Sequence, residues 1–219
     1  MNEKPLMKWG GICAFVFAVL WIVFEIFYLI SAGIPFQTPT VSEMANMLSG
    51  GAYRTFIVLF GISIFFYVVV AYSVYDYLRK TSYGLSRAGF GFVTVVIILW
   101  FVYWSLQTAG KTIALSGAYD FETQLSVIMN LLGSLMIPLL WAMVLYAFCW
   151  GLAFIKREGN NKIAGFLFLI TSLSAFLYYL FSIIGNVLIA NIIDLILVIV
   201  FIIAHLFVGT ILTAESKKG

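Results

Sequence analysis

Six long apolar segments restrict what this chain can fold into more than any other feature. They cover residues 9–33, 53–78, 85–115, 123–155, 163–185 and 191–213. A helix needs roughly 20 apolar residues to cross the hydrocarbon core of a bilayer, whereas barrel strands alternate polar and apolar residues over about 10 positions. Because lipid offers the backbone no hydrogen-bond partner, each crossing segment must be a helix. The sequence therefore predicts an all-α, polytopic membrane helix bundle with six transmembrane helices, forming a single domain over residues 1–219.

The composition excludes most other classes of protein. Hydrophobic residues make up 63% of the 219 residues and charged residues 10%, whereas soluble domains average about 45–50% and about 25%. A net charge of +3 on scattered bases gives no basic stripe for nucleic acid. With a single His and no nucleophile-elbow, zinc-protease or P-loop motif, the chain offers no multi-histidine metal centre and no known catalytic signature. We predict no metal, no cofactor and no nucleic-acid partner.

The basic residues are distributed unevenly between the two ends of the predicted bundle. Ten of the twelve Lys and Arg residues flank the apolar segments on the side that holds both chain ends, and only Arg54 and Lys111 lie on the other side. Loops rich in Lys and Arg remain in the cytoplasm. The pattern predicts a multi-pass protein of the cell membrane, surrounded by membrane lipids, with both termini cytoplasmic.

Three of the segments begin in a similar way, with a base followed by small residues. These beginnings are Lys8–Gly11, Arg87–Phe90 and Lys162–Phe166. Small residues let helix backbones approach closely, so the pattern is compatible with a repeat of three hairpins packed through these positions. Alternatively, bases followed by Gly or Ala simply mark the membrane surface. Gly10, Ala14 and Ala18 also form a small-residue face on which a partner helix could pack.

The first outer loop is the only long connection and carries a helix signal of its own. Thr40–Glu43 has the T-x-x-E pattern of a capping box, and Gly50-Gly51 ends the helical pattern. Between them, the apolar stripe of Val41–Leu48 predicts a short amphipathic helix on the outer membrane surface or across the mouth of the bundle.

Polar residues within the apolar segments concentrate in the outer half of the predicted bundle. Charged groups are costly inside a membrane and are functional candidates for that reason. We expect an outward-facing cavity lined from residues 9–33, 85–115, 163–185 and 191–213, roofed by the Val41–Leu48 helix. The predicted ligand-binding residues are Glu25, Arg54, Tyr103, Gln107, Lys111, Asn130, Tyr178, Asn186, Asp194 and His205.

Two further interpretations of these polar residues follow from their positions. Glu25 and Arg54 lie at similar depth on consecutive segments, and the sequence predicts that they form an ion pair. Alternatively, the uncharged polar groups only hydrogen-bond neighbouring helices, which is the favoured interpretation for the serines.

Several residues of the first half resemble a large prokaryotic family of uncharacterised six-helix integral membrane proteins, defined only as a domain of unknown function. The shared features are Gly10-Gly11, Glu25, the Val41–Leu48 helix, Tyr53-Arg54 and Tyr75-Asp76-Tyr77-Leu78, within residues 8–95. The resemblance implies a six-helix fold and its topology. It implies no activity.

Three functions are compatible with this pattern. The favoured one is binding, or helping to transport, a small or lipid-like ligand in the outer cavity. The second is an intramembrane enzyme that modifies a lipid, with Glu25 or Asp194 as general base and His205 as acid. Asp194 and His205 lie roughly 16 Å apart along one helix, too far to act on one bond, and we predict no catalytic residue. The third is a structural subunit of a membrane complex.

Overall fold

The chain folds into long helices in the part that the structure, a computed structural model, describes: residues 4–32, 46, 48–116 and 120–218. The helices are α1 (Lys4–Ala32), α3 (Gly51–Ser116), α4 (Phe121–Ile155), α5 (Asn160–Ile184) and α6 (Val187–Ser216). Each of them is long and apolar enough to cross a membrane. The prediction of an all-α protein with several long apolar helices is confirmed.

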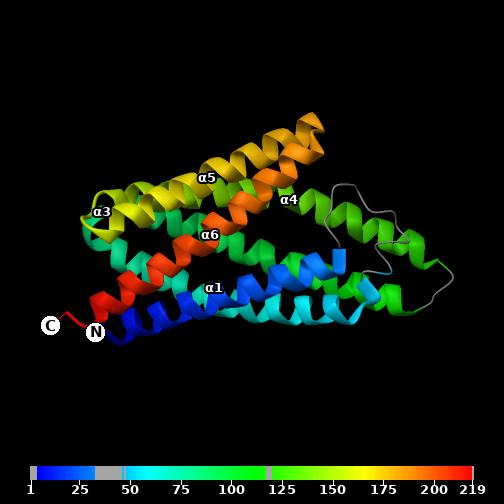
Figure 1. Cartoon of the computed structure of the whole chain (residues 1–219), viewed down its shortest axis with the longest axis horizontal. Helices are drawn as coiled ribbons and strands as arrows, with labels where there is room; N and C mark the ends of the chain where they lie inside the picture. Colours follow the sequence, from blue (N-terminus) through cyan, green and yellow to red (C-terminus); the bar gives the residue numbers. More distant parts are fainter. Residues whose placement is uncertain (1–3, 33–45, 47, 117–119, 219) are drawn as a thin grey trace.

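The structure differs from the predicted six separate helices at α3. This 66-residue helix contains both of the segments predicted at 53–78 and 85–115. Only Ser82 leaves helical geometry, at φ −148° and ψ 62°, and Figure 1 shows that α3 folds back on itself. The Ser86 hydroxyl donates a hydrogen bond of 2.9 Å to the Tyr75 carbonyl across this bend. The polar composition of residues 79–84 predicts a loop, whereas helical hydrogen bonding continues on both sides of Ser82.

The helices form a closed ring in which sequence neighbours pack side by side. α1 contacts α3, α3 contacts α4, α4 contacts α5 and α5 contacts α6, and α6 closes the ring against α1. Both termini lie at one end of the bundle, which we call the terminal end (Figure 1). At the opposite end of the bundle, which we call the remote end, the α5–α6 pair diverges from α1 and α3 (Figure 1).

Small residues bring the helices together near the terminal end. The closest approaches, where an added Cβ would collide with a neighbouring helix, are Gly10 against Ser73, Gly11 against Thr213, Gly89 against Trp150 and Gly165 against Gly151. At Gly165 the added carbon would lie 2.8 Å from the Gly151 carbonyl oxygen. The three segment beginnings in which a base is followed by small residues therefore lie at helix contacts, as expected for backbones that approach each other through Gly.

The small-residue face of α1 lies inside the chain's own bundle. Ala14 and Ala18 are completely buried, and Gly10 packs against Ser73 of α3 and Leu212 of α6. Helices of this chain therefore cover the face that the sequence offers to a partner helix.

Polar contacts tie the bend of α3 to the α4–α5 connection at the terminal end. The Arg157 guanidinium lies 3.7 Å from the centroid of the Tyr77 ring and donates a 2.7 Å hydrogen bond to the Tyr77 carbonyl. The Tyr77 hydroxyl in turn donates to the Asn161 side-chain oxygen at 2.9 Å. Nearby, Arg79 forms a 2.6 Å ion pair with the buried Asp76. These contacts hold the terminal end closed.

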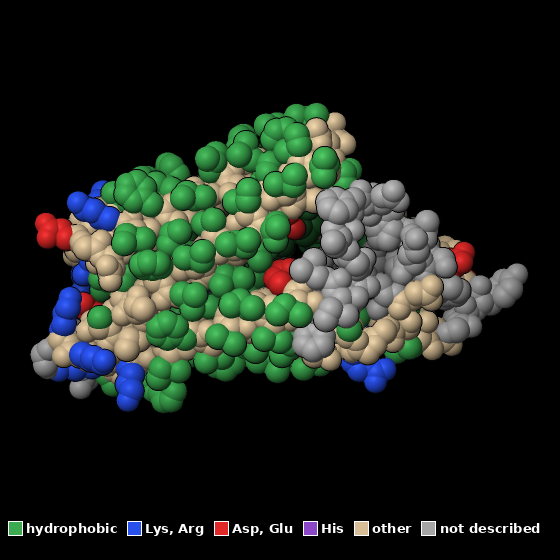
Figure 2. All heavy atoms as spheres, in the orientation of Figure 1, with side chains coloured by type: hydrophobic (Ala, Val, Ile, Leu, Met, Phe, Trp, Pro, Cys, Tyr) green, Lys and Arg blue, Asp and Glu red, His purple; other side chains and the backbone are tan. Residues whose placement is uncertain are grey.

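The outer surface of the ring is apolar along most of its length. Many large hydrophobic side chains are exposed, including Phe65, Ile98, Phe166, Leu173 and Ile183. Figure 2 shows that hydrophobic side chains cover this face of the bundle, while Lys and Arg gather at the terminal end. Soluble monomers do not expose apolar surface on this scale, so this surface is suited to lipid.

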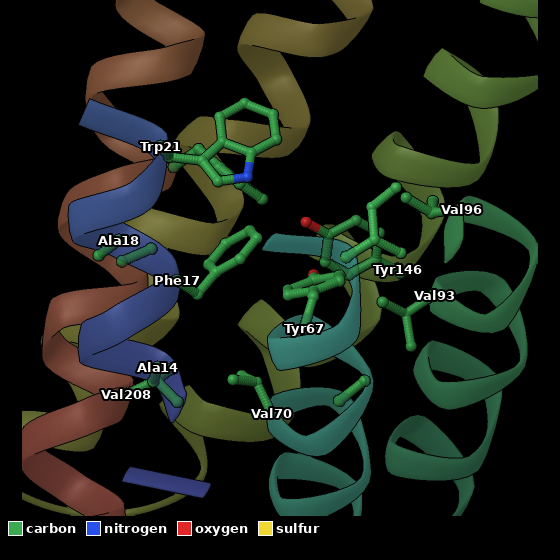
Figure 3. Packing of buried hydrophobic residues seen from close by; sticks show 14 of the residues in the cluster. Ala14, Phe17, Ala18, Trp21, Tyr67, Val70, Val93, Val96, Tyr146 and Val208 are labelled. Carbon is green, nitrogen blue, oxygen red and sulfur yellow. The ribbon is translucent and has the colours of Figure 1, made fainter. Parts of the chain in front are cut away.

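Aromatic rings from α1, α3 and α6 fill the centre of the ring. Phe17 of α1 stacks on Tyr67 at a centroid distance of 4.6 Å and contacts Phe201 at 5.7 Å. Figure 3 shows Phe17 and Trp21 pointing toward Tyr67 and Tyr146, which come from α3 and α4. This aromatic layer separates the terminal end from the remote end.

Most of the predicted Val41–Leu48 helix lies outside the described residues. Of its predicted stripe, the structure describes Leu48, which is buried. The predicted roof over the bundle therefore stays a prediction.

We predict that Gly89→Ala destabilises the fold, because the new methyl group would collide with the buried Trp150 ring. Overpacking of this kind costs about 1–3 kcal/mol of unfolding free energy. The matched control is Gly91→Ala, two residues away, where an added Cβ meets no atom within 4 Å. That variant should be neutral or more stable, since Ala favours a helix over Gly by about 1 kcal/mol. Thermal unfolding in a non-ionic detergent measures both, and equal stability of the two variants would contradict the α3–α4 contact.

Candidate functional site

A cavity lies inside the ring, between the aromatic layer and the remote end. Its volume is about 330 Å³, and residues of α1, α3, α4, α5 and α6 line it. The apolar part of its wall consists of Trp21, Phe24, Phe56, Phe60, Trp100, Met136, Leu139, Leu140, Met143, Leu197, Val198 and Phe201. Ligand sites in proteins have volumes of about 300–1,000 Å³ and mostly apolar walls with a few polar groups, so the cavity has the character of a small ligand site.

Five of the ten residues predicted to bind a ligand line this cavity. They are Glu25 of α1, Tyr103 and Gln107 of α3, Tyr178 of α5 and Asp194 of α6. Glu25 is half-buried and Asp194 is exposed. Figure 2 shows acidic side chains beside a hollow in the face of the molecule. The helix periodicity brings these groups together, since each occupies the inward face of its own helix.

A second cavity, of about 230 Å³, adjoins the first toward the remote end. It lies between α3 and α4 and includes Leu48, Gly110 and Gly133 in its lining. Tyr103, Gln107 and Met136 line both cavities. Its remaining lining, Tyr53, Leu125, Ile128, Met129 and Leu132, is apolar apart from one hydroxyl. A ligand with an elongated apolar part would find room on both sides of Gln107.

The other five predicted residues do not line either cavity. Arg54 and Asn130 are exposed, and Lys111 is half-buried away from the cavity walls. Asn186 caps α6, because its side-chain oxygen accepts a hydrogen bond of 3.2 Å from the Ile189 amide. α6 begins at Val187, whereas the predicted segment begins at residue 191. Asn186 therefore lies in the turn before α6 and not on an inward face of a helix.

The predicted ion pair between Glu25 and Arg54 is wrong. Among the residues that the structure describes, no ion pair joins the two side chains, and Arg54 is exposed while Glu25 lines the cavity. The physical reason is rotational: Arg54 lies on the outward face of α3, one position from the buried Tyr53. Similar depth along two helices does not ensure that two side chains face each other.

His205 lies beneath the cavity, in the aromatic layer. Its ring is completely buried between Phe201, Phe17 and Tyr67, at centroid distances of 4.3, 5.0 and 5.3 Å. Nδ1 lies 2.7 Å from the Phe201 carbonyl, which can only accept, so Nδ1 carries the proton. Nε2 has no hydrogen-bond partner among the described residues.

Other polar atoms of this layer have few partners in the described part of the chain. Trp21 Nε1 has none there, and the Tyr67 and Tyr146 hydroxyls interact only with each other. Figure 3 shows the side chains of these three residues together at the centre of the bundle. Buried polar groups normally find a protein or water partner, so this cluster is the polar part of an otherwise apolar floor.

The sequence does not predict the contribution of α4 to the cavity. Met136, Leu139, Leu140 and Met143 line it, at the spacing of three and four residues that marks one face of a helix. This spacing is present in the sequence, but α4 is apolar all round and shows no face that stands out. Of the aromatic residues next to Gln107 on α3, Trp100 and Tyr103 line the cavity, whereas Trp104 donates a 2.9 Å hydrogen bond to the Ile57 carbonyl.

The site offers no metal-ligand set within the described residues. No group of three or more His, Cys, Asp or Glu side chains comes together there, and Cys13 and Cys149 are both free thiols. Comparison with family models, curated proteins and solved structures finds no match for this chain. The cavity is therefore the feature of this chain that bears on its function.

We predict that Glu25→Gln stabilises the protein in the absence of added ligand, because it removes a half-buried carboxylate that has no cationic partner. The expected gain is about 1 kcal/mol, the lower end of the cost of a buried unpaired polar group. Arg54→Gln, at an exposed position, should change stability by less than about 0.5 kcal/mol. Thermal unfolding of the two single variants and the double variant measures both effects.

The double variant distinguishes this prediction from a hidden ion pair. Independent sites should add to within about 0.5 kcal/mol. A coupling energy above about 1 kcal/mol, with Glu25→Gln destabilising, would show that the two residues interact.

Proposed function

We propose that this chain is a multi-pass protein of the cell membrane with six crossings, in which each half of α3 crosses once. Five helices are long and apolar enough to span a bilayer, and α3, with 66 residues, is far longer than one crossing requires. The bend at Ser82 lies among Arg79, Lys80 and Arg87, the bases of a cytoplasmic turn. In this arrangement both termini are cytoplasmic and the remote end faces outward.

The protein's function in this proposal is to bind, or to help transport, a small or lipid-like ligand. The single observation that carries the proposal is the 330 Å³ cavity, lined by α1, α3, α4, α5 and α6 and by polar side chains otherwise costly at this depth. A bundle that only needed to be stable would pack this volume with apolar side chains. The cavity lies toward the remote end, away from the bases, so its opening is outward.

The geometry favours this function over the two alternatives. A lipid-modifying enzyme that uses Glu25 or Asp194 with His205 needs acid and base around one bond, whereas His205 lies below Phe201 and does not line the cavity. A purely structural subunit has no use for a cavity with two carboxylates in its wall.

The topology and the cavity can be tested together by cysteine labelling in intact cells. In a variant with both native cysteines replaced by Ala, we expect Val198→Cys to react with a membrane-impermeant maleimide added from outside, because Val198 lines the cavity. The matched control is Ile199→Cys. Ile199 is the next residue but lies on the exposed apolar face, so lipid should shield its thiol.

A third variant, Lys218→Cys, reports on the terminal end and should be labelled only after the cells are permeabilised. Labelling of Lys218→Cys in intact cells would overturn the orientation. Labelling of Val198→Cys only after permeabilisation would show that the cavity opens to the cytoplasm, and no labelling in either condition would show that it is closed.

A further inference from the structure

The charged groups that reach the cavity are all acidic. Glu25 and Asp194 line it, and no Lys or Arg does. All twelve Lys and Arg residues belong to the described part of the chain, and none forms an ion pair there with either carboxylate. Carboxylates held inside a membrane protein without a cationic partner are costly. A positively charged ligand would supply the partner that the chain does not.

A second, independent observation points to a ligand that donates hydrogen bonds. Gln107 is buried, with 6% of its surface exposed, and its side-chain oxygen has no partner among the described residues. This residue lines the cavity on the side opposite α6. An amide oxygen accepts and cannot donate, so an N–H group of a ligand would satisfy it.

The aromatic wall provides a third feature that suits a cation. The rings of Trp21, Trp100 and Phe201 pack against one another at the floor of the cavity, with centroid distances of 5.4 Å from Trp21 to Trp100, 5.1 Å from Trp21 to Phe201 and 6.3 Å from Trp100 to Phe201. Aromatic faces attract organic cations, most strongly those of Trp, and several such faces together recognise alkylammonium groups.

We infer that the ligand of this cavity is a hydrophobic organic cation, an ammonium group attached to an apolar body. This inference rests on the proposed ligand-binding function and names its ligand class. Glu25 and Asp194 supply the countercharge, the rings contact the cationic group from the floor of the cavity, and the methionine and leucine face of α4 accepts the remaining apolar part. A bare metal ion does not fit, because hard cations need about six or more oxygen ligands and this wall is mostly apolar.

The first test compares two thiol reagents of opposite charge on Val198→Cys in the cysteine-free full-length protein. The reagents are the trimethylammonium-ethyl and the sulfonato-ethyl methanethiosulfonates, and each rate is divided by its rate with a free thiol. Charged clefts raise the local concentration of counter-ions about 10- to 1,000-fold, so we expect the cationic reagent to be favoured at least about tenfold.

Matched double variants assign this preference to the cavity. The double variant Glu25→Gln with Asp194→Asn removes both acids from the cavity and should reduce the ratio of the cationic to the anionic reagent's rate to about one. Asp120→Asn with Glu122→Gln removes two exposed acids outside the cavity, at the start of α4, and should retain the preference for the cationic reagent. A preference near one in the unmutated cavity, or one that survives the Glu25 and Asp194 changes, overturns the cationic ligand class. No reaction with either reagent instead overturns the open cavity on which the proposed function depends.

The second test measures occupancy with benzyldimethylammonium, a protonated tertiary amine that carries one N–H group, as the probe. It should slow the reaction of Val198→Cys with a neutral maleimide, whereas benzylsulfonate at the same concentration should not. Glu25→Gln should weaken this protection about tenfold, as expected for the loss of one charged hydrogen-bond partner. Protection by benzylsulfonate and not by the ammonium would show that the cavity binds a ligand of the opposite charge.

A further arm distinguishes a soluble ligand from a lipid. The protection assay is repeated in nanodiscs that contain hexadecyldimethylammonium, a protonated tertiary amine whose ammonium group would reach the cavity from the bilayer. Protection by the membrane-borne cation alone assigns a lipid source, and protection by the benzyl compound assigns a soluble one. Absence of protection by both cations overturns the inference.

Discussion

The close packing of glycines at the terminal end is the constraint on which the rest of this bundle depends. Gly10 and Gly11 hold α1 against α3 and α6, and Gly151 and Gly165 hold α4 against α5. Helices that touch through Gly at one end and carry large side chains further along must diverge. Figure 1 shows this divergence for the α5–α6 pair. The cavity is therefore a consequence of how the terminal end is packed, and it lies where the aromatic layer no longer fills the widening ring.

The same geometry separates the charges of the chain. The terminal end carries most of the bases, held in part by the contacts of Arg157 with Tyr77, while the cavity carries the two acids Glu25 and Asp194. In water such a separation has little consequence because charges are screened. In a medium of low dielectric constant the interaction of an ionised acid with a cation is stronger, so the proposed cationic ligand would supply the charge that balances the two acids.

Much of the fold is predictable from the sequence because lipid allows few solutions. Apolar length gives the helices, and polar residues such as Tyr103, Gln107 and Tyr178 on otherwise apolar helices mark inward faces that the structure brings to one cavity. The rotation of each helix about its axis is less predictable. Arg54 shows this, since one residue of rotation separates it from the buried Tyr53. The apolar lining contributed by α4 is not predictable for a related reason: in a helix that is apolar all round, lipid-facing and cavity-facing residues have the same composition.

The floor of the cavity limits what the described conformation can do. Trp21, Trp100 and Phe201 close the cavity toward the terminal end, and Phe17 packs beneath them on Tyr67. A ligand in the cavity therefore has no path to the terminal end unless these rings change rotamer together. The polar atoms immediately below them, His205 Nε2 and the hydroxyls of Tyr67 and Tyr146, are the groups that such a movement would expose to the cavity. Binding thus requires only the remote half of the bundle, whereas transport would also require the aromatic layer to open. The polar atoms in that layer, of which His205 Nε2 has no partner among the described residues, reduce the cost of hydrating it.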